Sequence, residues 1–120
     1  MPLRILSASD VDNIIDSFTL SELQIMMARV FALISTSSSN IDTPARTSIR
    51  TTNHTALFMP ARIAPSSSAG GTSIKIVCVP QVPDMQGLPA TTLVLDESSG
   101  AVKAVVNARK LTALRNAAGM

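Results

Sequence analysis

Strand-like segments follow one another along most of this chain without helices between them, and this order limits the possible folds. The segments are rich in β-branched and apolar residues and are separated by turns rich in Gly, Pro, Ser and Asp. Strands in succession favour an α+β fold over alternating β–α units, so we expect a mostly antiparallel or mixed sheet of about five strands. Pro60 is expected to interrupt one segment. The segments cover residues 45–52, 55–63, 73–79, 91–95 and 101–106, and residues 3–6 are a further short strand candidate near the N-terminus.

Two amphipathic helices are predicted ahead of most of these strands. Residues 7–10 and 19–22 both have the spacing of a capping box, with Asp10 and Glu22 in the acidic position. Apolar residues then recur at i, i+3, i+4 and i+7 over residues 11–18 and again over residues 23–34. We expect the second helix to be the longer and the more buried of the two.

A third helical pattern begins at Ala108, directly after the last predicted strand. Leu111, Leu114 and Ala118 lie on one face of it, and apart from Gly119 no helix stop signal precedes Met120. We therefore expect the sheet to lead into the start of a helix, and residues 1–120 to be a partial domain that ends inside an element.

The composition argues against a nucleic-acid-binding protein. The chain carries a net charge of +2, but its basic residues are scattered and the longest basic run is Arg109-Lys110. Phosphate binding needs a clustered basic patch, and base stacking needs aromatic rings, of which this chain has three Phe and no Trp or Tyr. The expected partners are therefore small molecules and other protein chains.

Cysteine and histidine are too few for the common metal and redox sites. Cys78 is the only cysteine and is expected to be a small buried apolar residue, which excludes an internal disulfide. His54 is the only histidine, and no zinc site is expected. His54 is more typical of a surface strand or turn; a Ser-His-Asp triad stays open because serine is plentiful, although no nucleophile elbow is present. Without a signal-peptide pattern or an apolar run of membrane-spanning length, we expect a cytoplasmic protein.

Four short blocks, taken in order, resemble the ornithine cyclodeaminase/mu-crystallin family. Residues 43–46 resemble its Pro-x-Arg block, and residues 58–61 resemble its Met-Pro block. Ile-Lys-Ile-Val at 74–77, with Gly-Leu-Pro at 87–89, is similar to the family's Lys-[Val/Ile]-Val and Gly-Leu-Pro. Residues 111–118, Leu-Thr-Ala-Leu-Arg-Asn-Ala-Ala, are similar to its Leu-Thr-Ala-x-Arg-Thr-Ala-Ala. Asn116 departs from the usual Thr.

The resemblance implies a dimeric NAD(H)- or NADP(H)-dependent enzyme of amino-acid metabolism. Members have a substrate-binding and dimerisation domain and an inserted Rossmann domain that binds the cofactor. They convert ornithine to proline and ammonia, reduce cyclic ketimines or dehydrogenate amino acids. This chain resembles only the first of these domains and contains no G-x-G-x-x-G. We therefore expect the Rossmann domain to be absent, and the chain alone to bind no cofactor and to be inactive.

The resemblance also implies the site residues. Arg46 and Arg115 would bind the substrate carboxylate, for which the two-pronged guanidinium is suited. Lys75 would lie beside them, both binding the carboxylate and acting in catalysis, although strand alternation alone leaves open that Lys75 faces solvent. A substrate-contacting threonine would fall at Thr91, in a stretch that is shorter than in many members. The remaining strand-region arginines, Arg50 and Arg62, match no block and are expected to be surface charges.

A second class of function stays open beside the enzyme. The chain would then be a non-catalytic module that binds a small carboxylate or dimerises, pairing with a relative through an exposed sheet. Ornithine, a cyclic ketimine and an N-alkylated amino acid all present the same carboxylate, so the residues do not select among these substrates.

Overall fold

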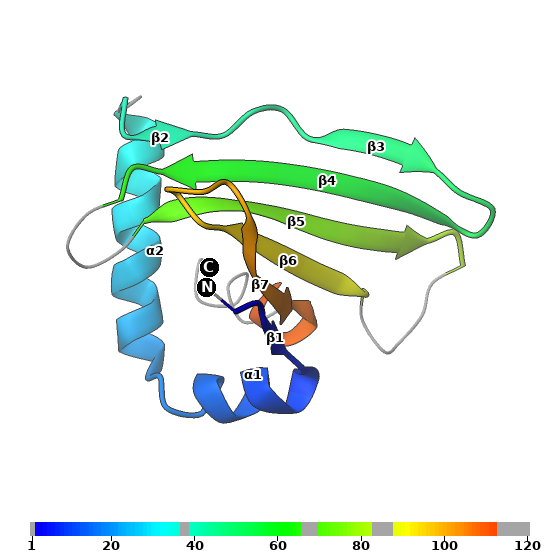
Figure 1. The fold of residues 1–120 in the computed structure, drawn as a ribbon, viewed down its shortest axis with the longest axis horizontal. Coiled ribbons are helices and arrows are strands. Elements are labelled where there is room, and N and C mark those ends of the chain that lie inside the picture. Colours follow the sequence, from blue (N-terminus) through cyan, green and yellow to red (C-terminus); the bar gives the residue numbers. More distant parts are fainter. Residues whose placement is uncertain (1, 37–38, 66–69, 83–87, 113–120) are drawn as a thin grey trace.

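The computed structural model describes residues 2–36, 39–65, 70–82 and 88–112, which form helices beside one mixed sheet of seven strands (Figure 1). This confirms the α+β class, with two more strands than expected. Residues 109–112 are also helical. The helices are α1 (Ala8–Ile15) and α2 (Leu20–Ser35), and the strands are β1 (Arg4–Leu6), β2 (Ile41–Asp42), β3 (Thr47–Arg50), β4 (His54–Ile63), β5 (Gly71–Pro80), β6 (Ala90–Leu95) and β7 (Val102–Asn107).

The sheet has the strand order β1-β7-β6-β5-β4-β2, and β3 also pairs with β4. The central strands β4 to β7 are antiparallel neighbours, as consecutive strands joined by short connections tend to be. The N-terminal strand β1 pairs parallel with β7, which makes the sheet mixed. The first and last strands of the chain therefore lie side by side.

Pro60 does not interrupt β4, contrary to the sequence-based expectation. Pro60 pairs in register with Ile74 of β5. On the other edge of β4, β3 pairs with residues 55–58 and β2 with residues 62–63, so the edge at Pro60 falls between the two pairings. A proline is tolerated in a strand where no ladder bond needs its missing N–H, and this gap supplies such a position.

The predicted local signals at the ends of elements are confirmed. Ser7 and Thr19 cap α1 and α2, and each completes a capping box with the acid three residues later. The hairpin between β6 and β7 turns through Gly100, which has a φ of 75°, a conformation that glycine adopts without strain. In the same turn the Asp96 carboxylate accepts hydrogen bonds from the backbone N–H groups of Ser98 and Ser99.

The expectation that α2 is the more buried helix is wrong. No residue of α2 is buried, whereas α1 buries Val11 and Ile15 and contacts β1 and β7. In Figure 1, α2 runs across the strand direction at one end of the view. None of the described residues packs closely enough against α2 to bury its apolar side chains. The large side chains that remain exposed on α2 are Leu20, Ile25, Met26, Phe31 and Ile34.

The two faces of the sheet differ in how the chain covers them. Side chains alternate along a strand, so Lys75 and Val77 lie on one face, the Lys75 face, and Ile74 and Ile76 lie on the other, the Ile74 face. On the Lys75 face, Val77 and Ala90 are buried in a cluster with Ala108, which follows β7. The core of the described chain therefore lies on the Lys75 face.

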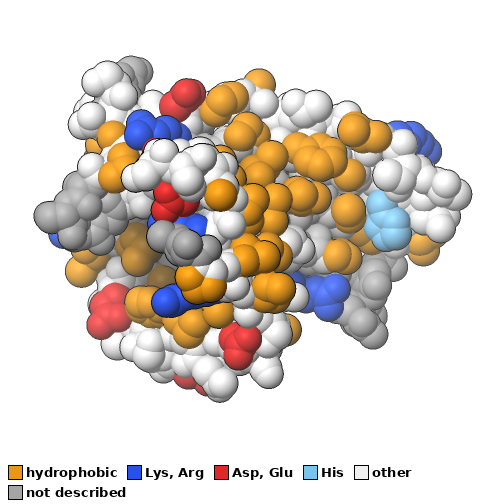
Figure 2. Space-filling view, in the orientation of Figure 1, with side chains coloured by type: hydrophobic (Ala, Val, Ile, Leu, Met, Phe, Trp, Pro, Cys, Tyr) orange, Lys and Arg blue, Asp and Glu red, His pale blue; other side chains and the backbone are white. Residues whose placement is uncertain are grey.

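The Ile74 face is apolar and less covered. Ala56 is its one buried residue among those described, and Ile5 is 69% and Ile49 55% exposed near its opposite edges. Hydrophobic side chains form a broad band over β4 to β6 in the view of Figure 2. The register assigns these apolar residues to the Ile74 face: Ile5, Ile49, Ala56, Phe58, Ile74, Ile76, Leu93 and Val105.

Candidate functional site

Lys75 lies in the middle of a row of side chains that crosses the sheet. It pairs with Met59 on β4 and with Thr92 on β6, and Thr92 pairs in turn with Val106 on β7. Directly paired residues carry their side chains on the same face, about 5 Å apart. Lys75 is half-buried in this row. We call Met59, Lys75, Thr92 and Val106 the Lys75 row.

Arg46 lies at the outer end of the same row. It directly precedes β3, whose first residue, Thr47, pairs with Phe58. Continuing this register by one residue brings Arg46 opposite Met59, on the Lys75 face. Its Cα is then two strand spacings, about 10 Å, from that of Lys75. Two long cationic side chains at this separation can converge on one small carboxylate.

The position of the threonine differs from the one that the resemblance implied. Thr91 pairs with Ile76 and therefore belongs to the Ile74 face. Thr92 pairs with Lys75 and carries its hydroxyl on the Lys75 face. The shorter stretch before this strand hides the register in the sequence, so only the strand pairing shows which of the two adjacent threonines adjoins the lysine.

Among the described residues, Arg50 and Arg62 do not join the row, as expected for surface charges. Arg115 lies outside the described residues. Arg50 is exposed on β3 and pairs with Thr55, away from the Lys75 row. Arg62 contacts Glu97 near one end of the sheet and has a side chain that is 46% exposed. Lys75 and Arg62 thus lie on opposite faces of the sheet.

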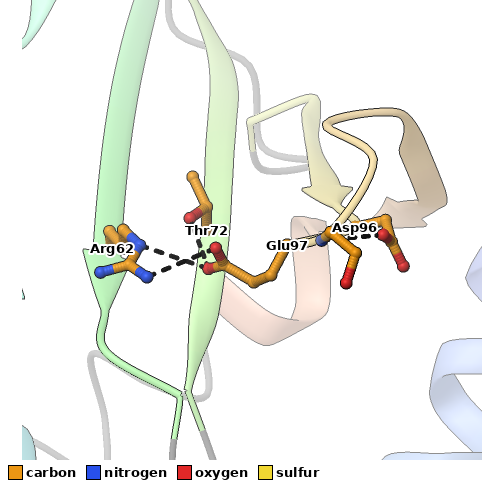
Figure 3. Close-up of polar contacts among 5 residues, drawn as sticks. Arg62, Thr72, Asp96 and Glu97 are labelled. Atoms are coloured by element: carbon orange, nitrogen blue, oxygen red, sulfur yellow. Dashed lines mark hydrogen bonds and ion pairs between the residues drawn. The ribbon is translucent and has the colours of Figure 1, made fainter.

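A polar cluster at one end of the sheet joins neighbouring strands to each other (Figure 3). The Glu97 carboxylate pairs with Arg62 Nε at 3.3 Å and accepts a 2.8 Å hydrogen bond from the Thr72 hydroxyl. These contacts, led by the Thr72 hydrogen bond, lower the pKa of Glu97. The cluster ties the β6–β7 hairpin to β4 and β5, and its charges are already paired with each other.

A cavity of about 350 Å³ opens at the β1–β7 edge, apart from the predicted residues. Its described lining residues are Pro2, Arg4, Lys103 and Ala104. Arg4 pairs with Ala104 and shares the Lys75 face, one row away from the Lys75 row. The sequence gives no signal for this cavity, because Arg4 and Lys103 are far apart along the chain and only the parallel β1–β7 pairing joins them.

The described residues do not fit a dinucleotide or a metal ion. Within them, no group of three His, Cys, Asp or Glu side chains could hold a metal. Their positive-φ glycines, Gly70, Gly71 and Gly100, lie ahead of or at the start of β5 and in a hairpin, not ahead of a helix, where a phosphate-binding loop is found. No single described helix is long and apolar enough to cross a membrane, although α1 and α2 pass that test jointly despite a bend of 100°.

Comparison with known proteins gives a match at the level of structure. No protein-family model matches the chain, and no curated protein matches it by sequence. An archaeal alanine dehydrogenase dimer with bound NAD superposes with a TM-score of 0.77 at 19% identity, over 98% of this chain. The Δ1-pyrroline-2-carboxylate reductase of Thermococcus litoralis, in complex with NADH and L-proline, gives a TM-score of 0.77 at 22% identity over 97% of this chain.

These likenesses establish the fold. The chain shares the fold of one part of the alanine dehydrogenase, which agrees with the fold that the four sequence blocks led us to expect. The chain spans 35% of the length of each of these two proteins. Both structures hold a nicotinamide cofactor, and one holds an imino acid.

Proposed function

We propose that this chain is the substrate-binding part of a nicotinamide-dependent oxidoreductase that acts on amino or cyclic imino acids. The observation that carries the proposal is the Lys75 row, where Lys75, Thr92 and Arg46 share one face of the sheet. The two similar structures support it, since one is an alanine dehydrogenase with NAD and the other a reductase with NADH and L-proline.

The row has the chemistry that an α-carboxylate requires. A guanidinium and an ammonium supply charge-assisted hydrogen bonds, which are stronger than those between neutral groups. Thr92 adds a hydroxyl donor beside Lys75. Half-burial of Lys75 reduces the competition from water for the bound carboxylate. We assign Arg46, Lys75 and Thr92 to carboxylate binding, and Lys75 in addition to catalysis as the charged group nearest the bound substrate.

The cofactor belongs to another part of the enzyme in this proposal. A nicotinamide cofactor supplies hydride transfer when it is bound. The described residues do not fit a dinucleotide, whereas the two similar structures are almost three times as long and hold one. We therefore propose that a further domain binds the cofactor and that this chain alone does not turn over substrate. Of the reactions that the resemblance implies, imine reduction is favoured over ornithine cyclodeamination by the reductase complex with L-proline.

A ligand titration of the chain tests the carboxylate site. The ¹⁵N-labelled chain would be titrated with L-proline and with pyrrole-2-carboxylate, a planar analogue of the cyclic imine, while amide resonances are followed by NMR. We expect saturable shifts at Met59, Lys75 and Thr92. Shifts at Arg4 and Lys103 alone would instead place ligand binding in the cavity at the β1–β7 edge and would overturn the assignment.

We further propose that the chain forms a dimer with a second copy through the Ile74 face. Ile5 and Ile49 are more than half exposed near its opposite edges, and an apolar face of this extent is typical of an interface. The similar alanine dehydrogenase is a dimer. The same face would serve the alternative of a non-catalytic dimerisation module, which differs by having no ligand at the Lys75 row.

Sedimentation equilibrium tests the dimer. We expect the wild-type chain to associate and the variant Ile49→Lys to shift toward the monomer by at least about ten-fold in dissociation constant, because a charge is placed in an apolar interface. The matched control is Ser48→Lys, the adjacent position on the Lys75 face, which should leave association unchanged. Equal association of Ile49→Lys and wild type would rule out this interface.

A further inference from the structure

We infer that the site takes an amino or imino acid with an uncharged, apolar side chain and rejects a diamino acid that carries a second ammonium. The inference rests on the proposed carboxylate site and adds its selectivity. It follows from the side chains that surround the Lys75 row on the same face.

The rows on either side of the Lys75 row hold no acidic side chain. If a substrate anchored by its carboxylate at Lys75 lies along the strands, its side chain is over one of these rows, which are about 7 Å away. One row consists of small, apolar and hydroxyl residues. The other is similar, and its only charged residue, Arg4, is a cation. The first row is Ser48, Leu57, Val77 and Ala90; the second is Ala61, Ser73, Val94, Ala104 and Arg4.

The described carboxylates are held elsewhere in the chain. Asp10 and Glu22 complete the capping boxes, and Asp12 forms an ion pair with Lys110 at 3.3 Å. Asp42 pairs with Arg62 in the register and so belongs to the Ile74 face. Three further carboxylates lie just after α1 or in the β6–β7 hairpin: Asp16, Asp96 and Glu97.

The length of ornithine brings its second ammonium to a neighbouring row that holds no acidic side chain. In its extended form the second ammonium lies roughly 6 Å from the carboxylate by ordinary bond lengths, which reaches the neighbouring row. There it would leave water for apolar side chains such as Leu57 and Val77 without a counter-charge. Burying an unpaired charge is strongly unfavourable, whereas an aliphatic or cyclic side chain gains from the same contacts.

A matched ligand pair tests the inference. L-norvaline and L-ornithine share the carboxylate, the α-ammonium and the three-carbon side chain, and differ in the second ammonium. Isothermal titration of the 120-residue chain at neutral pH should show L-norvaline binding about ten-fold or more tighter than L-ornithine. Equal affinity, or tighter binding of L-ornithine, would overturn the inference while leaving the carboxylate site in place.

A substitution at Leu57 tests the location of the effect. Leu57 is half-buried one row from Lys75, so Leu57→Glu places a carboxylate where the second ammonium would lie. We expect Leu57→Glu to reverse the preference in favour of L-ornithine, and the isosteric neutral control Leu57→Gln to keep it. If Leu57→Glu does not fold, the wild-type comparison still decides. Binding of neither ligand, nor of L-proline, to the wild-type chain would overturn the proposed function and this inference together.

Discussion

The two faces of the sheet are built from alternate residues of the same strands, yet they have opposite characters. The Lys75 face combines a cation and hydroxyls with small residues, and Ala108 closes over Val77 and Ala90 on it. The Ile74 face carries large apolar side chains, and Ile5 and Ile49 stay more than half exposed near its edges. The described chain thus covers part of the face that holds the polar row and leaves much of the apolar face open, which is why we propose that a second copy covers the Ile74 face.

The largest expected difference between the two faces is in the free energy of unfolding that is lost when a charged side chain is introduced on each. Val77 is 4% exposed and packs with Ala90 and Ala108, so Val77→Asp should lower the free energy of unfolding by about 4 kcal/mol or more. Ile49→Asp, on the exposed edge of the Ile74 face, should cost less than about 1 kcal/mol when unfolding is measured at a protein concentration low enough to keep both chains monomeric. Urea unfolding followed by circular dichroism measures both. Similar losses in the two variants would show that the faces are equally covered.

The next effect concerns ligand binding on the Lys75 face. Lys75→Ala removes a charge-assisted hydrogen bond worth about 1.5–3 kcal/mol, so the affinity for L-proline should fall roughly 10- to 100-fold. Arg50→Ala is the matched control, since Arg50 is an exposed cation off the row. Isothermal titration gives both affinities, and unfolding curves check that the fold is intact. Wild-type affinity in Lys75→Ala would remove Lys75 from the site.

A smaller effect distinguishes the adjacent threonines. Thr92 pairs with Lys75, whereas Thr91 pairs with Ile76 on the other face. Replacing a hydroxyl by a methyl of similar shape, Thr92→Val should weaken L-proline binding by the value of one neutral hydrogen bond, about 1 kcal/mol. Thr91→Val should leave the affinity unchanged. The opposite result would mean that the ligand lies on the Ile74 face.

Local signals in the sequence predicted much of the fold. The two capping boxes, the glycine of the β6–β7 hairpin and the strand periodicity each depend on a few neighbouring residues. The failures required long-range information. The sequence pattern of α2 predicts a buried helix, but burial depends on which surface meets it, and no residue of α2 is buried. Likewise, Pro60 is tolerated because β2 and β3 pair with β4 on either side of it.

For the candidate site, too, the sequence predicted some features, and others required the strand pairing. The resemblance named the candidate cations, but only the strand register shows that Lys75 and Thr92 share a row. That register chooses Thr92 over Thr91, and no single-strand pattern contains it. The sequence does not predict the cavity at the β1–β7 edge for the same reason, because only the pairing of β1 with β7 brings Arg4 and Lys103 to one cavity.

The smallest expected effect tests the Arg62–Glu97 ion pair on the Ile74 face. Arg62 and Thr72 lie on this face and hold the Glu97 carboxylate, so the pKa of Glu97 is lowered, first by the Thr72 hydroxyl and then by Arg62. A carboxyl group with a lowered folded pKa stabilises the protein above its unfolded pKa, near 4.3 for glutamate, and loses that effect as the pH falls through the folded value. Glu97→Gln should therefore melt slightly below wild type at pH 7.

This difference in melting temperature should stay constant from pH 7 to about pH 5 and shrink below about pH 4. Thr72→Val is the informative second variant, because it removes the largest cause of the lowered pKa and keeps the Arg62 pair. Its loss of stability should follow the same pH dependence. A difference that persisted or grew at pH 3 would mean that the side chains at this end of the sheet act through packing, and that the hairpin is attached by apolar contacts of the Ile74 face instead of by its charges.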